Sequence, residues 1–223
     1  PATYIGGVQV SNVRSAFGAS GQNLQMYYGD SLQAPRVTNL VKNGDFANIP
    51  PFAAATNTAS RYINGTATGD SGIDSVYKWR ANGAASSFTA QYDTTEARGS
   101  TASMKLSLTA GAGSARITYG NQSYIQTMIP CLPSTSYTLS AWVKCSGAAA
   151  VSVYITALDY DSSTSILATN SSTAIGGTTD WTLITKTWTT NASAAYIQPR
   201  IELNTGNVSD AWFDDIQLYL TNQ

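Results

Sequence analysis

The strongest constraint on the fold is a series of ten short segments in which apolar and polar side chains alternate. Alternation with a period of two is typical of a β-strand with one buried face. A charged content of only 11%, with many small polar residues, also favours strands and turns over helices. Short strands at this spacing predict an all-β sandwich or barrel. The segments are residues 86–92, 103–108, 115–119, 123–129, 137–144, 151–158, 165–168, 182–189, 196–203 and 211–220.

The same alternation assigns side chains to the two faces of each strand. In residues 196–203 the apolar members are Ile197, Pro199, Ile201 and Leu203. They predict a buried face, which leaves Tyr196, Gln198, Arg200 and Glu202 on the opposite face. By the same reasoning Trp142 and Tyr154 face outward. Because Pro199 has no N–H for a ladder, this strand is predicted to lie at a sheet edge or to carry a bulge.

Charge and composition exclude several classes of function. The net charge is -1, so no general electrostatic attraction favours nucleic acid, and no nucleic-acid partner is expected. The chain contains no histidine, which removes Ser-His-Asp catalysis and His-ligated zinc. The longest apolar runs are a few residues, far below the ~20 that span a bilayer, so no membrane insertion is expected.

The two cysteines, Cys131 and Cys145, are predicted to be free thiols. If residues 124–130 and 137–144 formed a hairpin, the two cysteines would lie about 26 Å apart, too far for a disulfide. A bond becomes possible only if the two segments belong to different sheets. Residues 1–4 also lack the basic and apolar regions of a secretory signal. Two histories fit this start: a signal or an upstream domain has been cut away, or, as we expect, the initiator methionine was removed before Pro1.

The chain divides near residue 38. Residues 1–38 contain short apolar clusters separated by glycines and end at Ala34-Pro35-Arg36, which predicts an N-terminal arm or docking segment. Residues 39–223 contain all ten alternating segments and predict the main domain. Within it, residues 50–83 are rich in turn-forming residues and are predicted to form a long surface loop.

The main domain resembles carbohydrate-binding modules of families 4, 9 and 22, and the resemblance covers about residues 39–220. The opening run at 39–46, Asn-Leu-Val-Lys-Asn-Gly-Asp-Phe, is similar to the start of the family. The run at 211–218, Ala-Trp-Phe-Asp-Asp-Ile-Gln-Leu, is similar to its end. Between them, residues 133–144 resemble its Pro-Gly-Thr-x-Tyr-x-Leu-x-Ala-Trp-Val-Lys strand. Residues 100–106 and 181–190 resemble two further strands of the family.

This resemblance implies a jelly-roll β-sandwich of two antiparallel sheets that binds saccharide without cutting it. The family also implies a structural calcium ion between the opening run and the terminal Asp pair, with Asp45 and Asp215 as candidate ligands. The family has a Glu directly after the opening Phe, and this chain has Ala47 there, so one expected calcium ligand is missing.

A sugar site needs flat aromatic faces and polar groups that donate to or accept from several hydroxyls. The outward-facing residues that supply both are Trp142, Tyr154, Gln198, Arg200 and Glu202. The other interpretation of this set is a Trp142 covered by a loop and a solvated Arg200–Glu202 pair. Trp79 and Tyr92 border the irregular region and are candidates for a site at a loop edge, unless they anchor the loop to the core.

No spacing of carboxyl groups singles out a catalytic pair; on a regular strand, Asp214 and Asp215 would point to opposite faces. We therefore expect no enzyme, but a glycan-binding protein on a bacteriophage virion surface or tail. Residues 1–38 are then expected to contact other virion subunits, in a homo-oligomer. The alternatives are a structural decoration or cement protein with no sugar ligand, and an accessory module of a secreted polysaccharide hydrolase.

Overall fold

A computed structural model describes twelve stretches of the chain: residues 4–5, 8–9, 39–41, 44–46, 55–56, 61–62, 79–83, 87–110, 113–120, 127–147, 152–205 and 209–221. The chain separates into two compact units, residues 1–38 with Gln223, and residues 39–222. In the first unit, β1 (Tyr4–Ile5) and β2 (Val8–Gln9) form a two-stranded antiparallel ladder.

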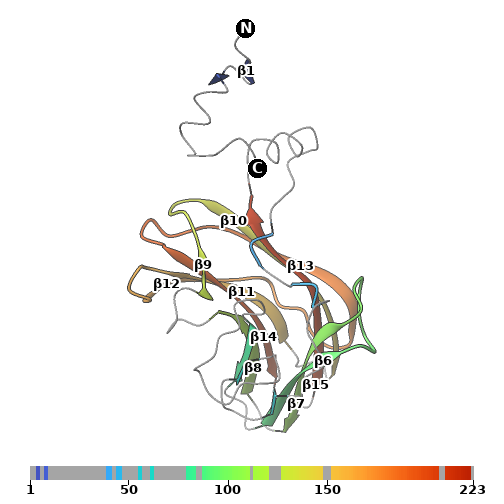
Figure 1. Ribbon diagram of the computed structural model, residues 1–223. Helices are drawn as coiled ribbons and strands as arrows, with labels where there is room; N and C mark the ends of the chain where they lie inside the picture. The colour runs from blue at the N-terminus through green and yellow to red at the C-terminus, as the bar shows by residue number, and fades with distance from the viewer. Residues whose placement is uncertain are drawn as a thin grey trace. The chain divides into compact units, whose positions relative to one another are not determined.

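The second unit is a jelly-roll β-sandwich built from two antiparallel sheets (Figure 1). The six-stranded sheet has the order β13-β10-β15-β7-β6-β3, and the other sheet has the order β12-β11-β14-β8-β5-β4, with β9 as a seventh strand beside β14. The strands of the first sheet are β3 (Ala55–Thr56), β6 (Ser87–Asp93), β7 (Ser103–Ala110), β10 (Ser136–Gly147), β13 (Thr179–Thr189) and β15 (Ser209–Leu220). Those of the second are β4 (Arg61–Tyr62), β5 (Trp79–Gly83), β8 (Gly113–Tyr119), β9 (Ile129–Pro130), β11 (Ser152–Tyr160), β12 (Ile166–Ser171) and β14 (Tyr196–Thr205).

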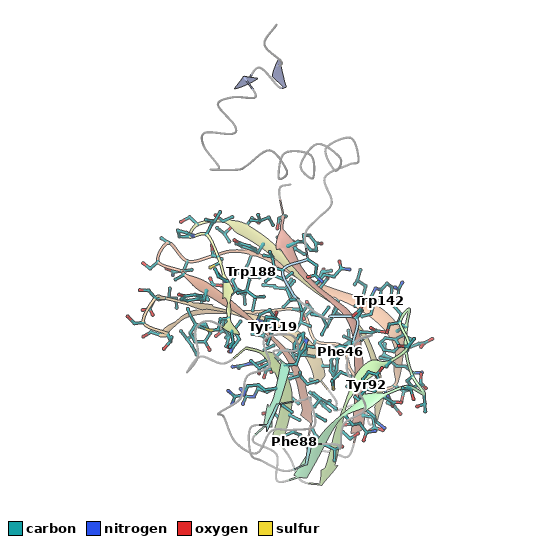
Figure 2. All side chains as sticks on the ribbon, in the orientation of Figure 1. Phe46, Phe88, Tyr92, Tyr119, Trp142 and Trp188 are labelled. Atoms are coloured by element: carbon teal, nitrogen blue, oxygen red, sulfur yellow. The ribbon has the colours of Figure 1, made fainter. Side chains whose placement is uncertain are left out.

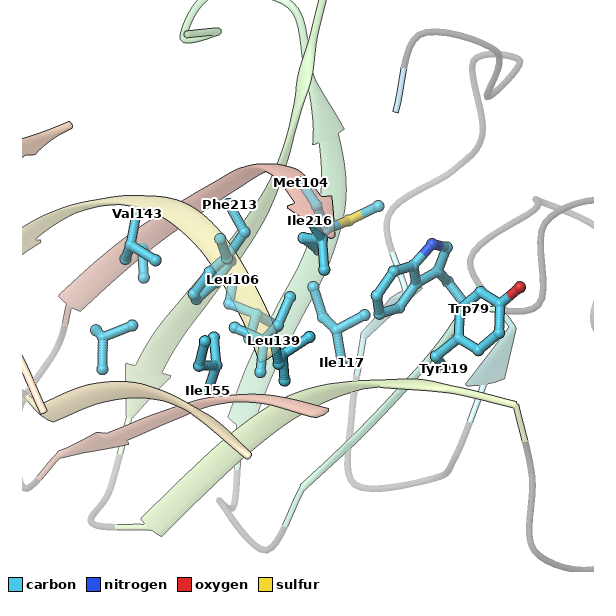
Figure 3. Close-up of a cluster of buried hydrophobic side chains, with 14 of the residues drawn as sticks. Trp79, Met104, Leu106, Ile117, Tyr119, Leu139, Val143, Ile155, Phe213 and Ile216 are labelled. Atoms are coloured by element: carbon cyan, nitrogen blue, oxygen red, sulfur yellow. The ribbon is translucent and has the colours of Figure 1, made fainter. Parts of the chain in front are cut away.

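The core lies between the two sheets, as the alternation predicted. Leu139 and Val143 of β10 and Ile155 of β11 are buried in one apolar cluster that includes Ile117 of β8 and Phe213 of β15. Figure 3 shows these side chains in a row that extends from Val143 to Trp79 and Tyr119. Burying large aliphatic side chains contributes on the order of 1.5–3 kcal/mol each, so this row is the main source of the sandwich's stability.

The first and last motifs of the domain are held together by hydrogen bonds. The Leu40 amide donates to the Leu218 carbonyl over 2.8 Å, and the Ile216 amide donates to the Gly44 carbonyl over 2.9 Å. The Asn39 side chain also accepts from the Leu218 amide and donates to the Ile216 carbonyl. Residues 39–41 and 44–46 are therefore held against β15, so the first and last motifs of the domain meet in the fold.

A β-bulge in β15 changes the direction of its two aspartates. The pairing with β10 shifts between Ser140 and Trp142, and Asp215 takes a φ of 49°, in the left-handed region. As a result both carboxylates contact the 98–100 turn: Asp214 accepts from the Arg98 amide at 3.0 Å, and Asp215 contacts the Arg98 guanidinium at 3.2 Å. The expectation that these two side chains point to opposite faces is wrong, because the bulge breaks the period of two.

The predicted strand boundaries need three further corrections. In the predicted segment 123–129, the strand β9 begins only at Ile129, and Thr127 and Met128 are not part of a strand. Residues 123–126 lie outside the described residues. The predicted loop at 50–83 contains β3, β4 and β5, and the rest of it lies outside the described residues. Pro199 lies in the central strand β14, neither at an edge nor at a bulge. It stands between the residues that pair with β9 and those that pair with β8, so it interrupts neither ladder.

Both cysteines are free, as predicted: Cys145 is fully buried and Cys131 is partly buried. The strands before them, β9 and β10, do belong to different sheets, which is the one arrangement in which a disulfide was considered possible. Among the described residues, none forms a helix with the length and hydropathy that crossing a bilayer requires.

Candidate ligand-binding face

Four of the predicted site residues lie together on the outer face of the seven-stranded sheet. In the register of the sheet, Tyr154 of β11 lies opposite Glu202 of β14, and Glu202 lies opposite Arg116 of β8. Two residues further along, Arg200 lies opposite Thr118, which in turn lies opposite Arg80 of β5. We call this surface the arginine face; its members are Arg80, Arg116, Thr118, Tyr154, Gln198, Arg200 and Glu202.

Hydrogen bonds hold the predicted residues of the arginine face in place. Glu202 lies 3.6 Å from Nη1 of Arg200 through Oε1, and accepts from the Tyr154 hydroxyl over 3.4 Å through Oε2. Gln198 accepts from the buried Tyr160 hydroxyl over 3.1 Å. Tyr160 itself packs with Met128, Leu158 and Tyr196 in a second apolar cluster at one end of this face. The polar groups are therefore fixed on a rigid sheet rather than on loops.

Although it is an outer face, this surface is shielded from solvent. Gln198 is 3% exposed and Glu202 9%. Burial lowers the pKa of the Arg200 guanidinium, and the nearby Arg116 charge acts in the same direction. Burial likewise raises the pKa of the Tyr154 phenol, so the hydroxyl stays a neutral hydrogen-bond donor at physiological pH. Shielded polar groups of this kind interact more strongly with a ligand than groups in water do.

Several donors on the arginine face have no partner among the described residues. The Nε atoms of Arg80, Arg116 and Arg200 are buried and make no hydrogen bond, and neither does the Thr118 hydroxyl. Thr118 is 3% exposed and lies between Arg200 and Arg80 in the register. A buried donor without an acceptor costs about 1–3 kcal/mol, and a ligand that supplies acceptors recovers this energy.

Trp142, the fifth predicted residue, lies on β10 of the other sheet, so its ring belongs to the opposite outer face (Figure 2). The Arg98 guanidinium covers this ring at 3.7 Å from the centroid, and Arg98 pairs with Asp215. The neighbouring Trp212 is covered in the same way by Lys105 and Lys144, which pair with Asp210 and Glu96. The aromatic rings of this face are thus already in cation–π contact with cations that also form ion pairs.

Trp79 and Tyr92 contribute to the core. Trp79 of β5 is 1% exposed and packs edge-on against Tyr119, with ring centroids 5.1 Å apart (Figure 3). Tyr92 of β6 is partly buried and packs against the same core cluster (Figure 2). The structure therefore places both side chains in the core and not at a loop edge; whether they also anchor the loop is not described, because most of residues 50–78 lie outside the described residues.

The calcium candidates do not form a site that fits this ion. Asp45 is exposed, and the Asp215 carboxylate is already paired with the Arg98 guanidinium. Asp214 is fully buried and its oxygens accept from two backbone amides and the Ser100 hydroxyl. Within the described part of the chain, no three acidic or cysteine side chains gather around one point. Calcium therefore remains a prediction of the family resemblance alone.

Arg80, Arg116 and Thr118 are members of the arginine face that the sequence analysis missed. The alternation in 115–119 gave a signal for two of them, because Arg116 and Thr118 fall between the apolar Ala115, Ile117 and Tyr119. Their neighbours could not be found in this way, because the order of strands in the sheet is not a local property. Arg80 lay inside the segment that was predicted to be a loop.

The fold and this face define a β-sandwich domain with a shielded polar face on one sheet, and a comparison with protein families identifies the class. Residues 38–209 match the family described as a carbohydrate binding domain. The match covers more than half of the chain, so the chain belongs to this family. The resemblance found from the sequence motifs is thereby confirmed. A comparison with curated protein sequences finds no match.

Solved structures similar to this chain include parts of much longer chains and one isolated domain. The arabinose-bound α-L-arabinofuranosidase MgGH51 matches with a TM-score of 0.55 and 17% identity, over 82% of this chain and 26% of that protein. The enzymatically active domain of bacteriophage CBA120 tailspike protein 4 matches at 0.51 and 14%, over 82% and 21%. The CBM22-1 xylan-binding domain of Paenibacillus barcinonensis Xyn10C gives 0.47 and 12%, over 78% and 99%. The chain thus spans about a quarter or less of the first two.

Proposed function

We propose that this protein binds glycans without cleaving them, and that the arginine face is the binding surface. The observation that carries the proposal is the set of buried donors on this face that have no partner among the described residues. Neutral and charged hydroxyl-rich ligands both offer acceptors for such donors. The other outer face offers fewer free groups, because its cations already cover Trp142 and Trp212 and pair with carboxylates.

The absence of catalysis is part of the same proposal. Glu202 is the carboxylate of the arginine face, and among the described strand residues of this face there is no second one. Hydrolysis by two carboxyl groups needs a partner within about 5–9.5 Å. Asp159, which lies on β11, faces the interior and accepts from the Trp188 indole at 3.0 Å. A binding role needs no second carboxylate.

We place this activity on a phage virion surface or tail, where it would serve adhesion to a host glycan. The support is chemical: both thiols are free, as in proteins that fold and assemble in a reducing compartment. Residues 1–38 form a separate unit and are proposed to attach the domain to other subunits in a homo-oligomer. An extracellular accessory module of a polysaccharide hydrolase is the alternative location.

A glycan array with the purified chain tests the binding function. We expect selective binding that Tyr154→Ala or Gln198→Ala reduces, because both changes remove hydrogen-bonding groups of the arginine face. Leu183→Ala is the control, since Leu183 is 47% exposed on β13 of the other sheet. Thermal melts show whether each variant is folded.

The other outcomes of the array identify the alternatives. Loss of binding in Trp142→Ala, with Tyr154→Ala unaffected, would place the site on the six-stranded sheet. If no glycan binds, and deletion of residues 1–38 breaks up an oligomer or releases the protein from a particle, a structural decoration role replaces the proposal.

A further inference from the structure

Three arginines on neighbouring strands face one carboxylate on the arginine face. Arg80, Arg116 and Arg200 come from β5, β8 and β14, which are adjacent in the sheet. Glu202 is the counter-charge described on this face, and it contacts Arg200 and Tyr154. Three guanidinium groups and one carboxylate give a charge of +2. No salt bridge joins Arg80 or Arg116 to an acidic side chain among the described residues.

Part of this excess positive charge is withdrawn from water, and that makes it costly in the free protein. The guanidinium charge of Arg200 is partly withdrawn from water, since its side chain is 17% exposed. Arg116 stands close enough to Arg200 for the two like charges to repel each other. Groups that are expensive to bury and that repel one another are stabilised by an anion that neutralises them.

The unpaired donors also match the chemistry of an anion. A guanidinium presents Nε–H and Nη–H in one plane, and this pair matches the two oxygens of a carboxylate or sulfate. In all three arginines the buried Nε lacks a partner among the described residues, so this edge of each group holds an unused donor. The Thr118 hydroxyl between Arg200 and Arg80 adds a further unpaired donor.

From this arrangement we infer that the ligand is an acidic glycan, whose sugars carry carboxylate or sulfate groups that the three arginines bind. The inference rests on the proposed glycan-binding function and specifies the chemical class of the ligand. A neutral sugar would leave two positive charges of the arginine face uncompensated, whereas an anionic sugar would pair with them and still use Tyr154 and Gln198 for its hydroxyls. The free Nε edges are then the determinants of specificity.

Titration calorimetry on the full chain with matched hexasaccharides tests the inference. Hexagalacturonate is the carboxylate probe, a heparin hexasaccharide the sulfate probe, and xylohexaose and cellohexaose the neutral probes. We expect at least one acidic probe to bind about tenfold or more tighter than either neutral one. The acidic probe that binds identifies the anionic group. Its affinity is expected to fall as NaCl is raised from 50 to 500 mM, because salt screens charges.

Variants connect this preference to the arginines. Arg116→Gln and Arg80→Gln are each expected to weaken binding of the acidic probe about tenfold and binding of the neutral probes by a smaller factor, so that the preference for the acidic probe falls. Lys186→Gln, on β13 of the other sheet, is the charge-matched control and is expected to leave the preference intact. The salt dependence of the unmodified chain tests the inference independently, should an arginine variant fail to fold.

The inference and the proposed function fail in different ways. If neutral and acidic hexasaccharides bind within twofold of each other, glycan binding stands and the acidic class is overturned. The same conclusion follows if the acidic preference persists unchanged in both arginine variants. If neither kind of probe binds, and the glycan array is also negative, the proposed function itself is overturned.

Discussion

At the scale of single residues, Gly44 is where the opening run touches the last strand most closely. A Cβ atom at this position would collide with the Ile216 carbonyl, which belongs to the backbone and cannot rotate away. We expect Gly44→Ala to lower the free energy of unfolding by about 2–3 kcal/mol, through displacement of residues 39–46 from β15. Urea unfolding measures this. Gly99→Ala is the control, because its Cβ would meet one side-chain oxygen at an ordinary 3.6 Å. Equal midpoints for the two variants would contradict the close approach.

Cys131 gives a prediction about pH. Burial, helped by the negative charge of Asp159, raises the pKa of this thiol from 9.0 to about 12. Since a raised pKa removes the reactive thiolate, its population at pH 8 is about a thousandfold lower than in an unperturbed cysteine. We expect the native protein to resist iodoacetamide at pH 8 and to react progressively faster above pH 10, as followed by mass spectrometry. Rapid alkylation of native Cys131 at pH 8, at the rate seen in urea, would refute the assignment.

At the scale of elements, the bulge in β15 decides where two aspartates point. Asp215 holds a φ of 49°, a conformation that Asn and Asp tolerate better than β-branched residues do. We expect Asp215→Val to cost about 1–2 kcal/mol more than Asp215→Asn in urea unfolding. The Asn variant loses only the partly exposed pair with Arg98, and such pairs contribute little. Similar costs for the two variants would mean that the bulge relaxes.

The strands also show which features of the fold a local sequence pattern can predict. Residues 196–203 could be interpreted correctly, because the alternation of Ile197, Ile201 and Leu203 with polar neighbours is a local property. The pattern could not show β5, whose five residues form a strand because β8 and β4 pair with them on either side. Nor could it show that β14 is central, since that depends on where β8 and β9 end.

The same limit applies to the site. The outward direction of Trp142 and Tyr154 followed from alternation, but their separation onto two sheets did not, because it depends on strand order. Gln198, Arg200 and Glu202 were placed together correctly because they occupy one face of one strand. Arg116 and Arg80 join them only through the register of β8 and β5.

At the scale of the whole molecule, the two outer faces of the sandwich differ in how their charges are satisfied. On the six-stranded sheet, Arg98, Lys105 and Lys144 each cover a tryptophan and pair with a carboxylate. On the seven-stranded sheet, buried guanidinium donors remain without partners in the part of the chain that the structure describes. Cations that are already paired have less to gain from a ligand, so this asymmetry supports the proposal that recognition takes place on the seven-stranded sheet.

The family resemblance and the structure lead to different expectations about calcium between the opening motif and β15. An ion held by Asp45 and Asp215 would join the first and last motifs and raise the Tm of the whole domain. The Arg98 guanidinium already neutralises Asp215, and Asn39, Leu40 and Gly44 already join the two motifs through hydrogen bonds. We therefore expect Tm to change by less than about 1 °C between 5 mM CaCl₂ and 5 mM EDTA, in thermal melts at constant ionic strength. Asp161→Asn is the control, because Asp161 lies in the turn between β11 and β12 and accepts from the Ser163 amide there. A clear rise in Tm with calcium that Asp215→Asn abolishes and Asp161→Asn retains would show that calcium displaces Arg98 from Asp215, as the family resemblance implies.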